Sequence, residues 1–116
     1  MAQYSTVSHS AFVRARSGYS VQLGARLAGL LEPALQAPGC LHFALQHSHC
    51  DDALWLVSGF WSNQEAMNDY FASPAMQVFS DVVQELLVDS LDLHTFHDVS
   101  HAQGGAALVQ VQQHVG

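Results

Sequence analysis

The stretch "CLHFALQHSHCDDALWLVSGFW", residues 40–61, contains the pattern that decides the fold. In residues 40–47 apolar and polar side chains alternate, which is typical of a β-strand with one buried face. Residues 53–61 are apolar on both faces, as in a strand that is covered on both sides. The five residues between these segments form a short polar stretch, so the whole stretch predicts a β-hairpin.

The segments before the hairpin predict a strand and a helix. Residues 5–16 are rich in β-forming and small polar residues, which favours a strand. In residues 20–35 the apolar positions recur every three or four residues, which indicates one amphipathic helix. Pro33 strains this helix near its end, and Pro38 with the following glycine closes it.

The segments after the hairpin predict two helices and a last strand. Ser62 and Glu65 have the spacing of a capping box, so a helix is expected to begin there. Pro74 ends that helix and stands at the first position of a second one. Residues 91–96 alternate again as a strand. The order is β-α-β-β-α-β, so we predict an α+β fold of the ferredoxin-like type.

The composition of the chain predicts one domain with a partner subunit. A chain of 116 residues forms one domain, and this one is 49% hydrophobic and only 11% charged. Such an apolar chain either hides surface in an oligomer or lines an apolar pocket. We expect a homodimer, because one face of the strand at 53–61 needs a cover besides the chain's own helices.

The charge of the chain argues against several classes of partner. The net charge is −7, with three arginines and no lysine. Nucleic acids and anionic membrane surfaces both need basic side chains, so neither is an expected partner. No apolar run could span a bilayer, and the first residues lack the layout of a signal peptide. We therefore expect a cytoplasmic protein.

Two further features concern the cysteines and the C-terminal residues. Cys40 and Cys50 lie at opposite ends of one predicted strand, roughly 33 Å apart at about 3.3 Å per residue. A disulfide needs Cα atoms within about 7 Å, so these cysteines cannot pair within one chain. We divide the chain into a domain of residues 1–98 and a C-terminal extension of residues 99–116. Residues 107–112 alternate like a strand, and we expect the extension to pack as a strand or arm on the partner subunit.

The segment "HSHC", residues 47–50, raises the question of a metal site. His47 and His49 could share one strand face and hold one ion. A closed zinc site, however, needs four ligands, usually in two separated pairs. A second spacing, formed by His94, His97 and His101, is weaker still. We interpret the segment as a hairpin turn and expect no metal site.

Several short motifs of the chain are similar to those of a known family. Pro38-Gly39-Cys40, the strand-ending Trp61, Glu65-Ala66 and Ser73-Pro74 occur in one register over residues 5–96. In these motifs the chain resembles the antibiotic biosynthesis monooxygenase family, which includes quinol monooxygenases. The resemblance implies a dimeric α+β barrel, in which the sheets of two subunits pack face to face.

The resemblance also implies an activity. Active members oxygenate phenolic, quinol or polycyclic aromatic small molecules without flavin, haem or metal, so no cofactor is expected. The chain departs from the family pattern at two positions, since Tyr70 and Ala75 stand where many relatives have histidine. Ser80 stands where haem-degrading relatives have their axial histidine, which argues against haem degradation. The alternative is a non-catalytic dimeric protein that binds a small molecule or assists a pathway.

The candidate site is a pocket between the sheet and the helices. Its expected polar groups are the Tyr70 hydroxyl and a base from a strand histidine, His9 or His42, because a pKa near 6.5 suits proton abstraction at neutral pH. Both histidines could instead be interface residues, and the sequence leaves open which of them faces the helices. Cys40 and Phe43 are interpreted as packing residues. The expected substrate-binding walls, which could equally be core residues, are Trp61, Met67, Phe71 and Phe79.

Overall fold

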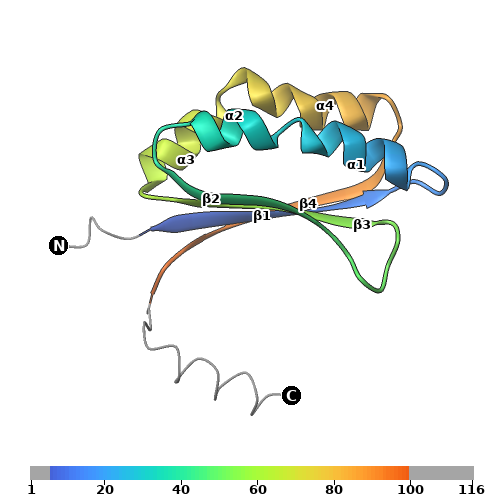
Figure 1. Cartoon of the computed structure of the whole chain (residues 1–116), viewed down its shortest axis with the longest axis horizontal. Coiled ribbons are helices and arrows are strands. Elements are labelled where there is room, and N and C mark those ends of the chain that lie inside the picture. Colours follow the sequence, from blue (N-terminus) through green and yellow to red (C-terminus); the bar gives the residue numbers. More distant parts are fainter. Residues whose placement is uncertain (1–5, 100–116) are drawn as a thin grey trace, which may run out of the picture.

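The structure is a computed structural model that describes residues 6–99, in which helices cover one face of a four-stranded sheet (Figure 1). The predicted order of strands and helices is confirmed. The extension lies outside the described residues except for Val99. The elements are β1 (Val7–Ala15), α1 (Ser20–Ala28), α2 (Leu31–Gln36), β2 (Cys40–His47), β3 (Leu54–Trp61), α3 (Gln64–Phe71), the 3-10 turn η2 (Pro74–Met76), α4 (Gln77–Gln84) and β4 (Val88–His97).

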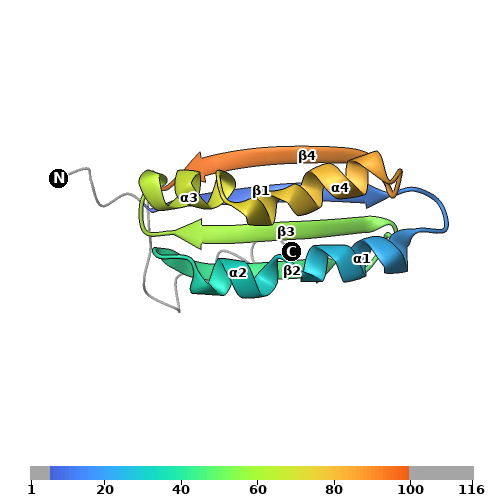
Figure 2. The same ribbon diagram turned by 90° about the horizontal axis from the view of Figure 1, so that it is seen from above.

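The sheet has the strand order β2-β3-β1-β4, and all neighbouring strands are antiparallel (Figure 2). In the centre of the sheet His9 of β1 lies opposite Gly59 of β3 on one side and opposite Thr95 of β4 on the other. Side chains that lie directly opposite each other share a face of the sheet. This register therefore separates residues that face the helices from those on the other side, here called the open face.

The hydrophobic core lies between the sheet and the helices. Trp61, Val57 and Val13 from the sheet and Leu23, Leu27 and Val82 from the helices have no more than 1% of their surface exposed. Each such side chain stabilises the fold by roughly 1.5–3 kcal/mol relative to an exposed position. Arg26 of α1 forms ion pairs with Asp81 of α4 and with Glu85, so the two helices are also joined at their surface.

The open face of the sheet carries large aromatic side chains that the chain itself does not cover. Phe60 of β3 and Phe96 of β4 both lie opposite Ser8 of β1, and Phe12 stands four residues further along β1. The exposed fractions of Phe12, Phe60 and Phe96 are 40%, 45% and 55%. Within the described residues, β3 is therefore covered on one face only, the one toward the helices.

The prediction of one helix over residues 20–35 was wrong, because the structure has two. α1 ends at Ala28, and α2 begins at Leu31. Proline has no amide hydrogen, so in a continuous helix Pro33 would leave the carbonyl of Gly29 without its partner. The break places Pro33 in the first turn of α2, where an amide hydrogen is not needed.

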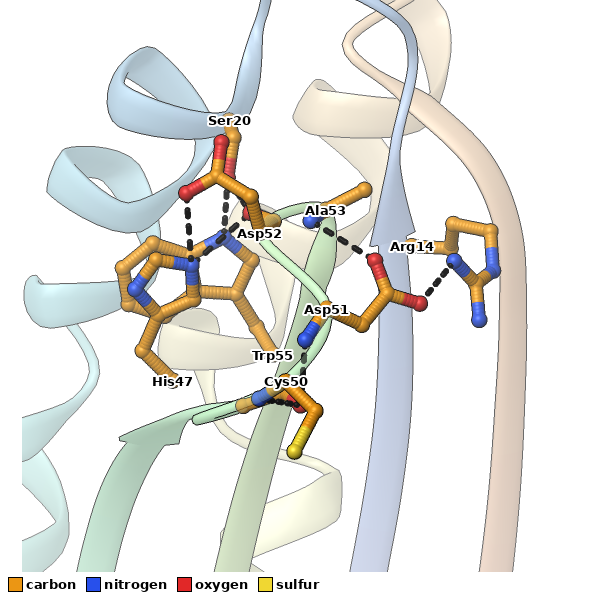
Figure 3. A network of polar contacts seen from close by, with 9 residues as sticks. Arg14, Ser20, His47, Cys50, Asp51, Asp52, Ala53 and Trp55 are labelled. Atoms are coloured by element: carbon orange, nitrogen blue, oxygen red, sulfur yellow. Dashed lines mark hydrogen bonds and ion pairs between the residues drawn. The ribbon is translucent and has the colours of Figure 1, made fainter.

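The hairpin prediction is confirmed, and polar contacts hold its loop (Figure 3). The hydroxyl of Ser48 accepts hydrogen bonds from the amides of Cys50 and Asp51, at 3.2 and 3.0 Å. The Asp51 carboxylate forms an ion pair with Arg14 of β1 at 2.6 Å. Asp52 and its neighbour Ala53 complete the turn into β3. The ion pair with Arg14 ties the loop to the sheet.

A second set of contacts ties the same hairpin to α1 (Figure 3). The ring of His47 stacks on Trp55 with centroids 4.0 Å apart, and its Nε2 donates to the carbonyl of Asp52 at 2.8 Å. Trp55 Nε1 donates to the Ser20 hydroxyl at 3.0 Å, which in turn donates to the same carbonyl at 2.5 Å. Over residues 6–99, no three His, Cys, Asp or Glu side chains are grouped so that they could hold a metal ion.

Two smaller observations concern the cysteines and the helices. Cys40 and Cys50 are both free thiols, as their separation predicted. In the part of the chain that the structure describes, no helix has the length and apolarity needed to cross a membrane.

The capping box prediction was wrong by one residue. α3 is capped by Asn63, whose side-chain oxygen accepts a hydrogen bond from the amide of Ala66 at 2.8 Å. Asn63 has an extended backbone (φ −161°, ψ 173°), which is the conformation an N-cap residue needs. Asparagine is as good a cap as serine, so the residue type alone could not decide between the two positions.

We predict that Asn63→Ala lowers the free energy of unfolding by about 1 kcal/mol, because one amide of the first turn loses its partner. Ser62→Ala is the matched control and should change this free energy by less than about 0.5 kcal/mol. Urea unfolding monitored by circular dichroism measures both. A larger loss for Ser62→Ala than for Asn63→Ala would contradict the assignment of the cap.

Candidate functional site

A cavity of about 290 Å³ lies between the sheet and the layer of α3, η2 and α4. Its walls are almost entirely apolar, and the lining residues with polar side-chain groups are His9 and Tyr70. An apolar cavity with a few polar groups is the usual form of a small-molecule site. The lining residues are His9, Ala11, Phe43, Tyr70, Phe71, Met76, Phe79, Leu91 and Leu93.

Gly59 makes room for the rings at one end of this cavity. A Cβ atom at Gly59 would lie 2.6 Å from Cε1 of His9 and 2.9 Å from Cδ2 of Phe43. Both residues pair with Gly59 across the sheet, one from β1 and one from β2. Because Gly59 has no side chain, the two rings can approach to 5.7 Å between centroids, and Phe71 meets His9 edge-on at 5.1 Å.

His9 is buried in this aromatic cluster, with 3% of its surface exposed. Its Nδ1 accepts a hydrogen bond of 3.1 Å from Nε1 of Trp61. Burial lowers the pKa of His9 from 6.5 to about 4, since the charged form is poorly solvated there. His9 is therefore neutral at pH 7.

Tyr70 of α3 is the second polar residue among those that line the cavity. Its hydroxyl donates a long hydrogen bond of 3.4 Å to the carbonyl of Leu30, and its ring lies 5.0 Å from that of Trp61. Burial, together with the nearby thiol of Cys40, raises the pKa of Tyr70 to about 12. Tyr70 therefore keeps its proton at neutral pH and can act as a hydrogen-bond donor.

The structure brings four of the seven predicted site residues together around the cavity, namely His9, Tyr70, Phe71 and Phe79. Trp61 and Met67, which were expected in the walls, are core residues with 0% and 5% exposure and are not among the lining residues. His42 is exposed on the open face, where its ring lies 6.0 Å from that of Phe60.

The sequence analysis missed five of the lining residues. Phe43 was interpreted as packing only, and Ala11, Met76, Leu91 and Leu93 were not considered as walls. Leu93 lies opposite Ala11, and Leu91 lies opposite Val13. The alternation in residues 91–96 indicated that these leucines share a face, but only the register with β1 shows that this is the face toward the helices.

Comparison with known proteins gives a family for this architecture. The family model described as antibiotic biosynthesis monooxygenase matches residues 6–82, which is more than half of the chain. The chain belongs to this family. The matched residues include β1, the hairpin and α3, and they contain most of the residues that line the cavity. No match was found among curated proteins.

Solved structures support the same fold. Protein SO0527 from Shewanella oneidensis is 22% identical with a TM-score of 0.76, over 82% of this chain and 92% of that one. Protein PA3566 from Pseudomonas aeruginosa is 19% identical with a TM-score of 0.75, over 84% and 98%. A protein from Deinococcus radiodurans, described as a candidate antibiotic biosynthesis monooxygenase, is 21% identical with a TM-score of 0.74, over 85% and 96%. At these identities the likeness shows the fold alone, which is the predicted ferredoxin-like α+β fold.

We predict that His9 makes the folded state less stable as the pH falls from about 6.5 to about 4. The pKa of His9 is about 4 in the folded chain and 6.5 in the unfolded one, so the unfolded chain binds more protons in this interval. At about 1.4 kcal/mol for each pKa unit, the loss is about 3–4 kcal/mol at most.

Urea unfolding of the wild type and of His9→Gln between pH 7 and about pH 4.5 measures this effect. The wild type should lose more stability than His9→Gln over that interval. His42→Gln, which removes an exposed histidine, should behave like the wild type. Equal losses in the wild type and in His9→Gln would show that the burial of His9 has no effect on its titration.

Proposed function

We propose that the chain is a cofactor-independent monooxygenase acting on a phenolic, quinol or polycyclic aromatic small molecule held in the cavity. The observation that carries this proposal is the aromatic and aliphatic cavity between the sheet and the helices, with two polar groups in its wall. A flat, largely apolar ligand with one or two oxygen atoms suits such walls. Membership in a family named for monooxygenases supports the reaction type.

The proposed reaction uses the substrate as the source of electrons. A deprotonated phenol, quinol or anthrone is electron-rich enough to react with O₂ at a ring carbon. In the anthrone case one oxygen atom of O₂ becomes the new carbonyl, and the other leaves as water with the two hydrogens which that carbon lost. The protein supplies a site without bulk water and hydrogen bonds to the substrate oxygen.

Residues of the cavity have separate roles in this proposal. The Tyr70 hydroxyl donates to the Leu30 carbonyl at 3.4 Å, and in the proposed complex it turns to donate to a substrate oxygen instead. His9 is the second polar contact. Phe71 and Phe79 form the walls against the substrate ring. Trp61 and Met67 support these residues from the core.

We predict that Tyr70→Phe lowers oxygen uptake with a quinol or anthrone substrate by up to about 100-fold, because a donor to the developing oxyanion is lost. Ligand affinity should fall much less, since the ring remains. Tyr19→Phe, which changes an exposed tyrosine, is the matched control. An oxygen electrode measures uptake, and unchanged uptake by Tyr70→Phe would remove Tyr70 from the proposed site.

One observation favours a non-catalytic binding protein as the second candidate. Among the described lining residues none titrates near neutral pH, since burial lowers the pKa of His9 to about 4 and raises that of Tyr70 to about 12. A site without a neutral-pH base could bind an aromatic ligand and leave it unchanged. Binding of a quinol without any oxygen uptake above buffer would favour this candidate.

We also propose that two copies of the chain pair through their open faces, as the family resemblance implies. Phe12, Phe60 and Phe96 form an apolar surface on the face that the helices leave uncovered. Asp92 of β4 lies opposite Phe12, so the open face also carries one carboxylate beside this apolar surface. The extension of residues 99–116 remains a proposed contact with the partner subunit.

We predict a dimer of about twice 12.6 kDa in solution. Phe60→Glu should shift the mass to that of a monomer, because each dimer would otherwise bury two charges in apolar surroundings. Val21→Glu, on the exposed surface of α1, is the control and should leave the dimer intact. Light scattering at micromolar concentration measures the mass. A wild-type monomer at that concentration would contradict the proposal.

A further inference from the structure

The contact between Trp61 and His9 determines which nitrogen of His9 carries its proton. The indole N–H is a donor and cannot accept, so the ring atom that it meets must have a free lone pair. That atom is Nδ1 of His9, at 3.1 Å from Nε1 of Trp61. In a neutral imidazole the proton is then on Nε2. The other tautomer would bring two N–H groups face to face inside the core.

The position of Trp61 leaves this contact little freedom. Trp61 lies opposite Val7, two residues from His9, on the face toward the helices. Its side chain is completely buried, and the ring of Tyr70 packs against it at 5.0 Å. The lack of a side chain at Gly59 allows the imidazole to lie within reach of the indole, since a Cβ there would be 2.6 Å from Cε1 of His9 and 3.1 Å from Trp61 Nε1.

The remaining nitrogen of His9, Nε2, has no hydrogen-bond partner among residues 6–99. No side-chain nitrogen or oxygen in that part of the chain is both fully buried and unpartnered. Since Nε2 has no partner, it is not fully buried, and His9 is one of the residues that line the cavity. Nε2 is therefore the atom of His9 that is open to a ligand in the cavity.

No charged group near His9 favours its protonation. The rings that pack against it are those of Phe43, Trp61 and Phe71, and Thr95 of β4 lies opposite it in the sheet. None of these side chains titrates. Tyr70, which also lines the cavity, has its pKa raised to about 12, and the partly buried Cys40 thiol near Tyr70 has a raised pKa as well. Over the described residues, no Asp, Glu, Lys or Arg lines the cavity.

We propose that Trp61 is a positioning residue that holds His9 in the Nε2–H tautomer, so that the cavity binds an ionised ligand oxygen as a hydrogen-bond acceptor and does not take a proton from it. The inference deepens the proposed function, on which its relevance to catalysis rests. Under it, a phenol or enol loses its proton to water before or during entry, and the Nε2–H group of His9 donates to the resulting oxyanion. The cavity then selects ligands by the acidity of their own hydroxyl group.

The first test is spectroscopic and needs no ligand. Nitrogen-15 NMR of histidine-labelled protein distinguishes the two neutral tautomers by the shifts of the ring nitrogens. His9 should show a protonated Nε2 in the wild type and a mixture of tautomers in Trp61→Phe. Trp55→Phe is the matched control, because it removes an indole N–H that donates to Ser20 instead. A protonated Nδ1 on His9 in the wild type would overturn the proposal.

The second test measures binding as a function of pH with three probes. These are 1-naphthol, 4-nitro-1-naphthol, whose nitro group lowers its pKa, and 1-methoxynaphthalene, which cannot ionise. The affinity of each naphthol should rise by about tenfold as the pH passes the pKa of that probe, and the methoxy compound should show no such rise. A common midpoint for both naphthols would indicate a titrating group of the protein and overturn the proposal.

Variants connect this anion preference to the two side chains. Trp61→Phe should lose most of the tenfold preference, whereas Trp55→Phe should retain it. His9→Gln keeps an N–H donor and should retain part of the preference, but His9→Phe should lose all of it. If Trp61→Phe fails to fold, the wild-type tautomer and the probe series still decide the question.

These tests separate this inference from the proposed reaction. They measure a tautomer and binding constants, so they remain valid for a protein that consumes no oxygen. Anion preference without oxygen uptake would support the inference and contradict the monooxygenase proposal. Oxygen uptake without anion preference would support the monooxygenase proposal and contradict the inference about His9.

Discussion

The buried hydrogen bond from Trp61 to His9 is the contact on which the rest of the site depends. An imidazole in an apolar layer is costly unless its polar atoms have partners. Nε1 of Trp61 donates a hydrogen bond of 3.1 Å to Nδ1 of His9, and the absence of a side chain at Gly59 leaves the space in which the two rings meet. Because His9 is thereby held in place, Phe43 and Phe71 pack against its ring, and the cavity begins beyond it.

Most of the fold could be predicted from the sequence because its strands follow simple periodicities. The alternation in residues 40–47 and the apolar run in residues 53–61 predicted β2 and β3 with errors of no more than one residue. The polar residues between them predicted the hairpin loop. Local patterns were insufficient where two similar residues compete, as at Ser62 and Asn63, or where one residue, Pro33, decides between a strained helix and a broken one.

The site was less predictable, because a strand pattern shows which residues share a face but not what covers that face. His9 and His42 were equivalent candidates in the sequence, yet the first lines the cavity and the second lies on the open face. Trp61 has the residue type of a pocket wall, but its diagonal position to His9 across the β1–β3 pair makes it a core residue. The leucines of β4 become walls only through pairing with β1.

The arginines of the chain have a consequence for how a ligand approaches. Arg14 is paired with Asp51, Arg26 with Asp81 and Glu85, and Arg16 donates to the carbonyl of Leu86 at 3.3 Å. These are the only basic residues besides histidine in a sequence with a net charge of −7. The long-range field of the molecule is therefore negative, and it slows the diffusional encounter with any anion. Added salt shortens the range of this repulsion to about 10 Å at 0.1 M, so an anionic ligand associates faster as the ionic strength rises, whereas a neutral one does not.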